Sequence, residues 1–294
     1  MSVLNGAATG VAVITPFNEE GAVDHASLST IIQFLMDSSI QFLVALGTTG
    51  ESVTLSPKER QEVFATFVRE VDGRVPLVMG LGGNNTHALV NEFKSINVTG
   101  FDAILSVTPY YNRPSQEGLY RHYMALDAVT KLPLIVYNVP GRTGVNMTAE
   151  TTLRLAHDAK NIIGVKDASG DLQQGKKIID NCPKGFLVLS GDDETAIPLT
   201  LLGGAGVISV AAGGFPKTFV AGINAALKND ETAANRINEQ LLPVIDLLFK
   251  EGNPAGIKAV SKLKGLSSDA VRLPLVEASE ALTAALTSFV EALD

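Results

Sequence analysis

The chain has 294 residues, of which 46% are hydrophobic and 18% are charged, and its formal net charge is −8. This composition is typical of a compact globular enzyme and excludes a disordered chain, and an acidic chain without a basic run argues against a nucleic-acid partner. The one cysteine, Cys182, rules out an internal disulfide and indicates a reducing compartment. Because residues 1–10 lack a secretory signal and no apolar segment could span a bilayer, we expect a soluble, cytoplasmic protein that does not bind membranes.

Eight short apolar runs, rich in β-branched residues, recur along the first two thirds of the chain, with segments of helical spacing between them. Their starts lie roughly 20 to 35 residues apart, which is the length of one strand-plus-helix unit. The predicted strands are 11–15, 42–46, 76–80, 102–107, 133–138, 161–166, 186–190 and 206–210.

Helix starts stand between these runs. Ser56-Pro57-Lys58-Glu59 is a capping box with proline at the first helical position, and it predicts a helix to about Val71. After about residue 216 the strand pattern stops, and we expect a helical C-terminal extension packed on the strands and their helices. Its predicted helices are 221–228, 233–250, 255–263 and 277–293.

Eight alternations of strand and helix, with strands apolar on both faces, leave a closed (β/α)8 barrel or an open doubly wound sheet. The open dinucleotide-binding fold needs G-x-G-x-x-G after its first strand, where Thr15-Pro16-Phe17 stands instead. We therefore predict an α/β TIM barrel, with a catalytic domain over residues 1–215 and a helical region over residues 216–294.

The sixth run ends in Lys166, where the pattern asks for another valine or isoleucine. An unpaired buried ammonium is costly, so burial there favours the neutral amine, which can attack a carbonyl and form an imine. Tyr137 ends the preceding run, which places it on the neighbouring strand of a barrel, where its hydroxyl could shuttle protons. The alternatives are a strand that ends at Val165 with Lys166 in solvent, and a tyrosine that serves only the core.

Other strand ends carry further candidates. Gly47-Thr48-Thr49-Gly50 offers backbone N–H groups and two hydroxyls that could cradle a carboxylate or phosphate, although an ordinary glycine-rich turn has the same residues. Arg142 could bind a carboxylate through two hydrogen bonds, or could be a surface residue capping its turn. Tyr110 and Tyr111 share a proline-flanked loop, and one facing a subunit interface is as plausible as one facing the site.

Metal, nucleotide and serine chemistry find no support in the sequence. The four histidines have no ligand spacing, no G-x-S-x-G is present, and Lys177 stands where a P-loop needs serine or threonine. We interpret the acidic run Asp192-Asp193-Glu194 as a helix cap rather than a metal site. Amine catalysis on a carbonyl compound remains, without a metal or a cofactor.

Six motifs, in register over nearly the whole chain, make the sequence resemble the dihydrodipicolinate synthase family of pyruvate-dependent class I aldolases. They are Thr15-Pro16-Phe17, GTTGE at 47–51, TPYYNRP at 108–114, YNVPGRTG at 137–144, GVKDASGD at 164–171 and GDD at 191–193. The wider family includes N-acetylneuraminate lyase, and the arginine of YNVPGRTG and the TPYYNRP loop distinguish the synthase branch. The resemblance implies condensation of pyruvate with L-aspartate-4-semialdehyde in the diaminopimelate route to lysine.

The resemblance also implies roles for eight residues. Lys166 forms the imine with pyruvate, and Tyr137 relays protons together with Thr48 and Tyr111, the last from a neighbouring subunit of a homotetramer built as a dimer of dimers. The substrate-binding residues are Thr49 for the pyruvate carboxylate, Arg142 for the semialdehyde carboxylate, and Gly191 and Ile208 through their backbone.

Departures from the family pattern concern regulation. Pro57 and Arg60 replace histidines of lysine-inhibited members, and Ala88 replaces a glutamate that would hold the inhibitor's ammonium, so the resemblance implies weak or absent inhibition by lysine. The matching positions are Ser52, Val53, Pro57, Arg60, Asn84, Ala88 and Tyr110. Two alternatives to the synthase stay open: another pyruvate aldolase, such as a sialic-acid or keto-deoxy-sugar lyase, and a non-catalytic barrel that senses pyruvate or serves as a scaffold.

Overall fold

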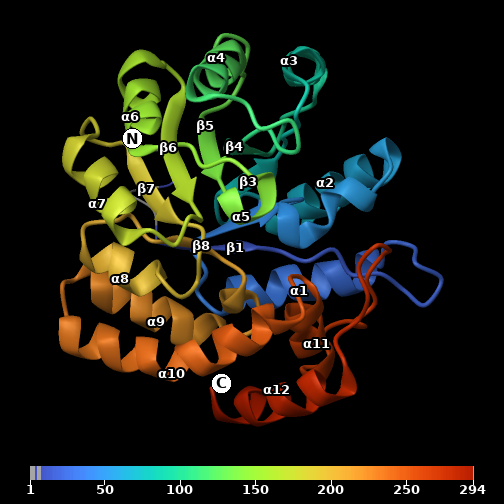
Figure 1. Cartoon of the computed structure of the whole chain (residues 1–294). Helices are drawn as coiled ribbons and strands as arrows, with labels where there is room; N and C mark the ends of the chain where they lie inside the picture. The colour runs from blue at the N-terminus through green and yellow to red at the C-terminus, as the bar shows by residue number, and fades with distance from the viewer. Residues whose placement is uncertain (1–3, 5–7, 294) are drawn as a thin grey trace.

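Eight parallel strands close into a barrel in sequence order, with β8 pairing back onto β1 (Figure 1). The structure is a computed structural model and describes Leu4 and residues 8–293. The strands are β1 Thr9–Ala12, β2 Phe42–Ala45, β3 Leu77–Gly80, β4 Ala103–Val107, β5 Leu134–Asn138, β6 Ile162–Asp167, β7 Leu187–Ser190 and β8 Val207–Ser209. The predicted TIM barrel is confirmed.

The first strand is the one whose predicted position was wrong. It begins at Thr9 and ends at Ala12, whereas the apolar run predicted 11–15; the other strands start and end within one residue of the prediction. A side chain on Gly10 would lie 2.2 Å from the ring of Phe42, so the position must be small for that ring to fill the lumen. The strand therefore starts in residues that carry no apolar signal.

Helices cover the outside of the barrel. They are α1 His25–Asp37, α2 Pro57–Val71, α3 Thr86–Ser95, α4 Gln116–Asp127, α6 Ala149–Asp158, α7 Leu172–Asn181, α8 Ala196–Leu201 and α9 Pro216–Leu227. The predicted capping box opens α2, since the Ser56 hydroxyl accepts from the Glu59 N–H and the Glu59 carboxylate accepts from the Ser56 N–H. Four short elements follow three of the strands: η1 Thr48–Gly50 and η2 Ser52–Thr54 follow β2, α5 Pro140–Thr143 follows β5, and η3 Ala211–Gly213 follows β8.

Three further helices lie together with α9 on one side of the barrel, drawn orange to red in Figure 1. They are α10 Glu231–Lys250, α11 Ala255–Leu263 and α12 Glu280–Ala292; α10 packs on α8 and α9, and α11 packs on α10 and α12. The helix predicted at 221–228 begins at Pro216, a residue preorganised for the first turn. The division of the chain at residue 215 stays a prediction. Among the described residues, no helix is long and apolar enough to cross a membrane.

The lumen of the barrel is filled by its own cluster of apolar side chains, separate from the core between strands and helices. Phe42, Val44, Leu105, Ile135 and Leu189 are among its buried members. Since this packing closes the middle of the barrel, a small molecule can enter the barrel only at one of its ends. In barrels of this kind the site lies at the carboxyl ends of the strands.

Candidate active site

Lys166 and Tyr137 are direct neighbours at the ends of β6 and β5. The parallel register pairs Tyr137 with Lys166, and the lysine Nζ lies 4.2 Å from the centroid of the tyrosine ring. Their side chains are 5% and 6% exposed, so the alternative of Lys166 in open solvent does not hold. The lysine nitrogen thus lies over the face of the tyrosine ring.

Gly191, directly after β7, leaves the space that the Lys166 side chain occupies. A Cβ at this position would lie 2.7 Å from Lys166 Cε and 2.9 Å from Lys166 Cγ, so any larger residue would displace the lysine. Ile208 in β8 is fully buried in the lumen cluster. The lysine is thus confined between Tyr137 and the backbone of Gly191.

A cavity of about 240 Å³ opens at the carboxyl ends of β2 to β5, and Tyr137 is the member of the pair that lines it. Thr48, Tyr137 and Arg142 line it together, and Arg142 is exposed to solvent, as a group that meets an incoming anion must be. Thr49 is buried beside the cavity, and its hydroxyl accepts a hydrogen bond of 3.1 Å from the Asn253 amide. A larger groove between α2 and α3, about 780 Å³, shares only Arg60 with the cavity.

The two tyrosines of the TPYYNRP loop face different ways. Tyr110 lines the cavity, and its carbonyl accepts a hydrogen bond of 3.1 Å from the Asn84 side chain. Tyr111 is 90% exposed and has a positive φ of 74°, which is uncommon for a residue with a side chain. Its orientation is the one that a residue serving a neighbouring subunit would need, and that role stays a prediction.

The acidic run after β7 differs from the expected helix cap. Asp192 accepts from the Thr195 N–H at 3.0 Å, whereas Asp193 turns inward and accepts from the N–H groups of Val210 and Ala211 at 3.1 and 2.8 Å. Burial raises the pKa of Asp193 to about 6. The interpretation as a cap of the following helix is therefore wrong for Asp193, because its Oδ2 accepts from two successive N–H groups and ties the end of β7 to the turn after β8. No cluster of histidine, cysteine and acidic residues suited to a metal is found among the described residues.

No role was predicted from the sequence for three buried polar residues in and around the turn after β2, namely Glu51, Asn253 and Lys258. Glu51 forms an ion pair with Lys258 of α11, and Asn253 contacts Thr49. The available signal was Lys258 itself, a cation whose neighbours on both sides, Ala255-Gly256-Ile257 and Ala259-Val260, are apolar or small. Such a residue needs a buried partner.

A barrel with a buried lysine against a tyrosine at the carboxyl ends of its strands has the arrangement of an imine-forming, aldolase-type lyase. The model of the dihydrodipicolinate synthetase family matches residues 7–293. The chain belongs to this family.

Individual relatives agree over nearly the full length. The chain is 47% identical to a 4-hydroxy-tetrahydrodipicolinate synthase of Flavobacterium psychrophilum over 97% of both chains. It is 44% identical to that of Bacillus subtilis over 99% of this chain and 100% of the relative. Among solved structures, the dihydrodipicolinate synthase of Acinetobacter baumannii in complex with pyruvate superposes with a TM-score of 0.93 at 40% identity, covering 97% of this chain and 98% of the other.

Proposed function

We propose that this chain is a 4-hydroxy-tetrahydrodipicolinate synthase, which condenses pyruvate with L-aspartate-4-semialdehyde at the first step of the diaminopimelate route to lysine. The observation that carries the proposal is the confined Lys166 amine, 4.2 Å from the Tyr137 ring centroid at the rim of the barrel. Full-length similarity to synthases of this name supports the same reaction. No cofactor is required, because pyruvate itself becomes the covalent group.

The reaction begins when the neutral Nζ of Lys166 attacks the keto carbon of pyruvate. Tyr137 and Thr48 pass protons as the carbinolamine forms and loses one water, which leaves a protonated imine. The imine withdraws electrons, so the methyl carbon gives up a proton and becomes the nucleophilic end of an enamine. That carbon attacks the aldehyde of the second substrate, and a proton from the relay neutralises the new alkoxide.

Ring closure releases the enzyme. The amino group of the bound semialdehyde attacks the imine carbon and displaces the Lys166 amine, so the product is a six-membered cyclic imine that keeps the new hydroxyl. One water and one proton leave per turnover. The proposed anion sites are Thr49 with its turn for the pyruvate carboxylate and Arg142 for the semialdehyde carboxylate, with Gly191 and Ile208 lining the site through their backbone.

The proposed assembly is a homotetramer in the cytoplasm, in which Tyr111 of one subunit completes the proton relay of another. The exposed Tyr111 side chain supports this arrangement, since a phenol held outward from its own subunit can reach a neighbouring one. A Tyr111→Phe variant mixed with an inactive Lys166→Ala variant should regain activity when mixed subunits form.

Borohydride reduction in the presence of pyruvate tests the proposal. Mass spectrometry of the intact chain should show one pyruvate adduct, and peptide mapping should place it on Lys166. Lys166→Arg should abolish the adduct, while Lys160→Arg, at an exposed position before the same strand, should not. Absence of an adduct on wild-type protein would favour a non-catalytic barrel and would end the proposal.

A further inference from the structure

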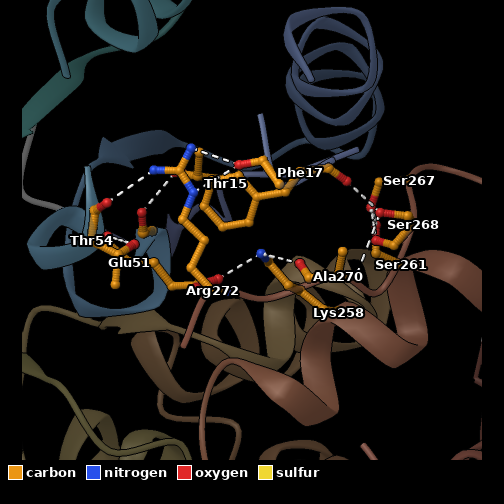
Figure 2. A network of polar contacts seen from close by, with 12 residues as sticks. Thr15, Phe17, Glu51, Thr54, Lys258, Ser261, Ser267, Ser268, Ala270 and Arg272 are labelled. Atoms are coloured by element: carbon orange, nitrogen blue, oxygen red, sulfur yellow. Dashed lines mark hydrogen bonds and ion pairs between the residues drawn. The ribbon is translucent and has the colours of Figure 1, made fainter. Parts of the chain in front are cut away.

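A buried ion pair joins the turn after β2 to helix α11. Lys258 Nζ lies 2.5 Å from Glu51 Oε1, and the two side chains are 0% and 1% exposed (Figure 2). The same ammonium donates to the Ala270 carbonyl at 2.7 Å. Burial lowers the pKa of Lys258 to about 8, although the attraction of Glu51 opposes this shift.

Arg272 completes the surroundings of the pair. Its backbone N–H donates to Glu51 Oε2 at 3.0 Å, and its guanidinium donates to the Thr54 carbonyl at 2.9 Å. The ring of Phe17 lies against both cations, 4.1 Å from Lys258 Nζ and 4.5 Å from Arg272 Cζ, as Figure 2 shows. One carboxylate oxygen of Glu51 is therefore held by α11 and the other by the segment between α11 and α12.

The other residues of the turn are held as well. The Asn253 side chain donates to Thr49 Oγ1 at 3.1 Å, and Thr15 Oγ1 donates to the Gly50 carbonyl at 2.7 Å. Contacts from far along the chain thus reach three successive residues, Thr49, Gly50 and Glu51. The turn needs this support, because Glu51 has a φ of 50°, a left-handed conformation that a non-glycine residue adopts at a cost.

Stability alone is a weak explanation for this arrangement. Replacing a buried ion pair by apolar residues of similar size is often neutral or stabilising, since the desolvation of both charges is then avoided. The direction of the hydrogen bond, from the Asn253 amide to the Thr49 hydroxyl oxygen, indicates a role in binding instead. A hydroxyl can donate one hydrogen bond. Because the Thr49 oxygen accepts from Asn253, its own proton stays available for donation to another acceptor. In the proposed function, the carboxylate of the keto acid is that acceptor at Thr49.

We propose that Asn253 and Lys258 are positioning residues, which act through Thr49 and Glu51 to hold the turn at residues 47–51 in the geometry that binds the keto-acid carboxylate. The inference rests on the proposed function of this turn. It makes the segment from 253 to 272 a determinant of affinity for the first substrate, although this segment acts on the turn after β2 and not on Lys166 or Tyr137.

The first experiment measures pyruvate affinity without the second substrate. The pyruvate concentration for half-maximal borohydride trapping is determined for wild type, Asn253→Ala, Thr49→Val and the double variant. Asn253→Ala should raise this concentration by up to about tenfold, the upper end of the net contribution of one hydrogen bond between neutral groups. Because Asn253 acts through the Thr49 hydroxyl, the double variant should be no weaker than Thr49→Val alone.

Asn253→Asp adds a test that general loss of stability cannot imitate. Aspartate has the shape of asparagine, but it accepts the proton of Thr49 and places a negative charge behind the turn. Half-saturation by pyruvate should therefore rise further than in Asn253→Ala, while the KM for the semialdehyde stays within about twofold of wild type.

The ion pair is tested with a matched control on the same helix. Lys258→Gln leaves the Glu51 charge unpaired and should weaken pyruvate binding, and the Glu51→Gln/Lys258→Gln double variant, which restores a neutral hydrogen-bonded pair, should recover most of it. Lys262→Gln, one turn further along α11, removes an ion pair with Asp269 and should leave pyruvate binding unchanged. Melting temperatures of all variants report folding.

The outcomes separate this inference from the proposed function. If wild-type protein traps no pyruvate, the proposed function has failed. If it does, but Asn253→Ala and Thr49→Val act independently in the double variant, Asn253 does not work through Thr49. A Lys258→Gln variant that melts earlier yet binds pyruvate as wild type does would make the ion pair purely structural and would overturn its part of the proposal.

Discussion

Asn138 and Asp167 are opposite each other in the register of β5 and β6, and the Asn138 amide donates a hydrogen bond of 3.0 Å to the Asp167 carboxylate. They directly follow Tyr137 and Lys166, and since side chains alternate along a strand they point away from the lumen. The same carboxylate accepts from the Ser169 N–H at 3.1 Å and from the Gln174 amide at 3.0 Å. This outer network fixes the orientation of the inner pair.

Asn138→Ala should lower kcat about tenfold, because the ends of both strands lose their link and the amine and phenol are no longer held in one orientation. Because the substitution leaves the buried partners of the Asn138 amide without a hydrogen bond, it should also reduce the free energy of unfolding by about 1–3 kcal/mol. Steady-state kinetics and urea unfolding measure the two effects. Asn161→Ala is the control, since its amide bonds the Asp127 carbonyl at the amino end of β6. An equal fall in kcat in both variants would make the effect one of stability, not position.

Tyr137→Phe separates proton transfer from packing. The ring that faces Lys166 is kept and only the hydroxyl is lost, so pyruvate should still bind with a KM near that of wild type. Loss of a general acid–base group should lower kcat about 100-fold or more. Borohydride trapping after short incubations with pyruvate should show that the adduct on Lys166 forms more slowly than in wild type. Unchanged kcat would remove Tyr137 from the relay and leave it as a wall of the lysine pocket.

Arg142→Ala tests the second substrate and discriminates among pyruvate aldolases. Arg142 is exposed at the rim of the cavity, and its loss should raise the KM for the semialdehyde by about 10- to 100-fold, since a charge-assisted contact contributes about 1.5–3 kcal/mol. The KM for pyruvate should change little. Arg142→Lys should recover only part of the loss, because lysine lacks the planar pair of donors. Equal increases in the KM values for both substrates would favour another pyruvate aldolase, one that acts on a different second substrate.

Inhibition by L-lysine should be weak or absent. Arg60 is paired with Glu92 at 3.4 Å, and the Asn84 amide is engaged by the Tyr110 carbonyl, so these groups already have partners within the chain. Ala88 provides no carboxylate for the inhibitor's ammonium. Initial rates at increasing lysine concentration, at fixed pyruvate, measure the effect. Half-inhibition below the millimolar range would contradict the expectation.

The residues that sequence analysis placed correctly are those whose signal is local. Buried parallel strands are nearly continuous apolar runs, so their ends were predicted within a residue except at β1, where Gly10 leaves room for Phe42. Lys166 stood out because it interrupts such a run. The ion pair of Glu51 with Lys258 was missed since its halves are far apart in sequence, and neither the turn nor the helix alone indicates which group the other will meet.

The pH dependence of stability should carry the signature of His122. This side chain is 3% exposed in α4, its Nδ1 lies 2.9 Å from the Thr86 hydroxyl, and burial lowers its pKa to about 4. Between pH 6.5 and 4 the unfolded chain therefore binds more protons than the native one, so stability is full above pH 6.5 and is lost as pH falls toward 4. By pH 5 the loss from this group is about 2 kcal/mol.

Urea unfolding of wild type and His122→Asn at pH 7 and pH 5 measures this contribution. Asparagine can keep a hydrogen bond to Thr86 but does not titrate, so the variant should lose about 2 kcal/mol less than wild type between the two pH values. The comparison is needed because Asp193, with its pKa raised to about 6, acts in the opposite sense over the same range. Parallel losses in both proteins would show that His122 does not govern the acid limb.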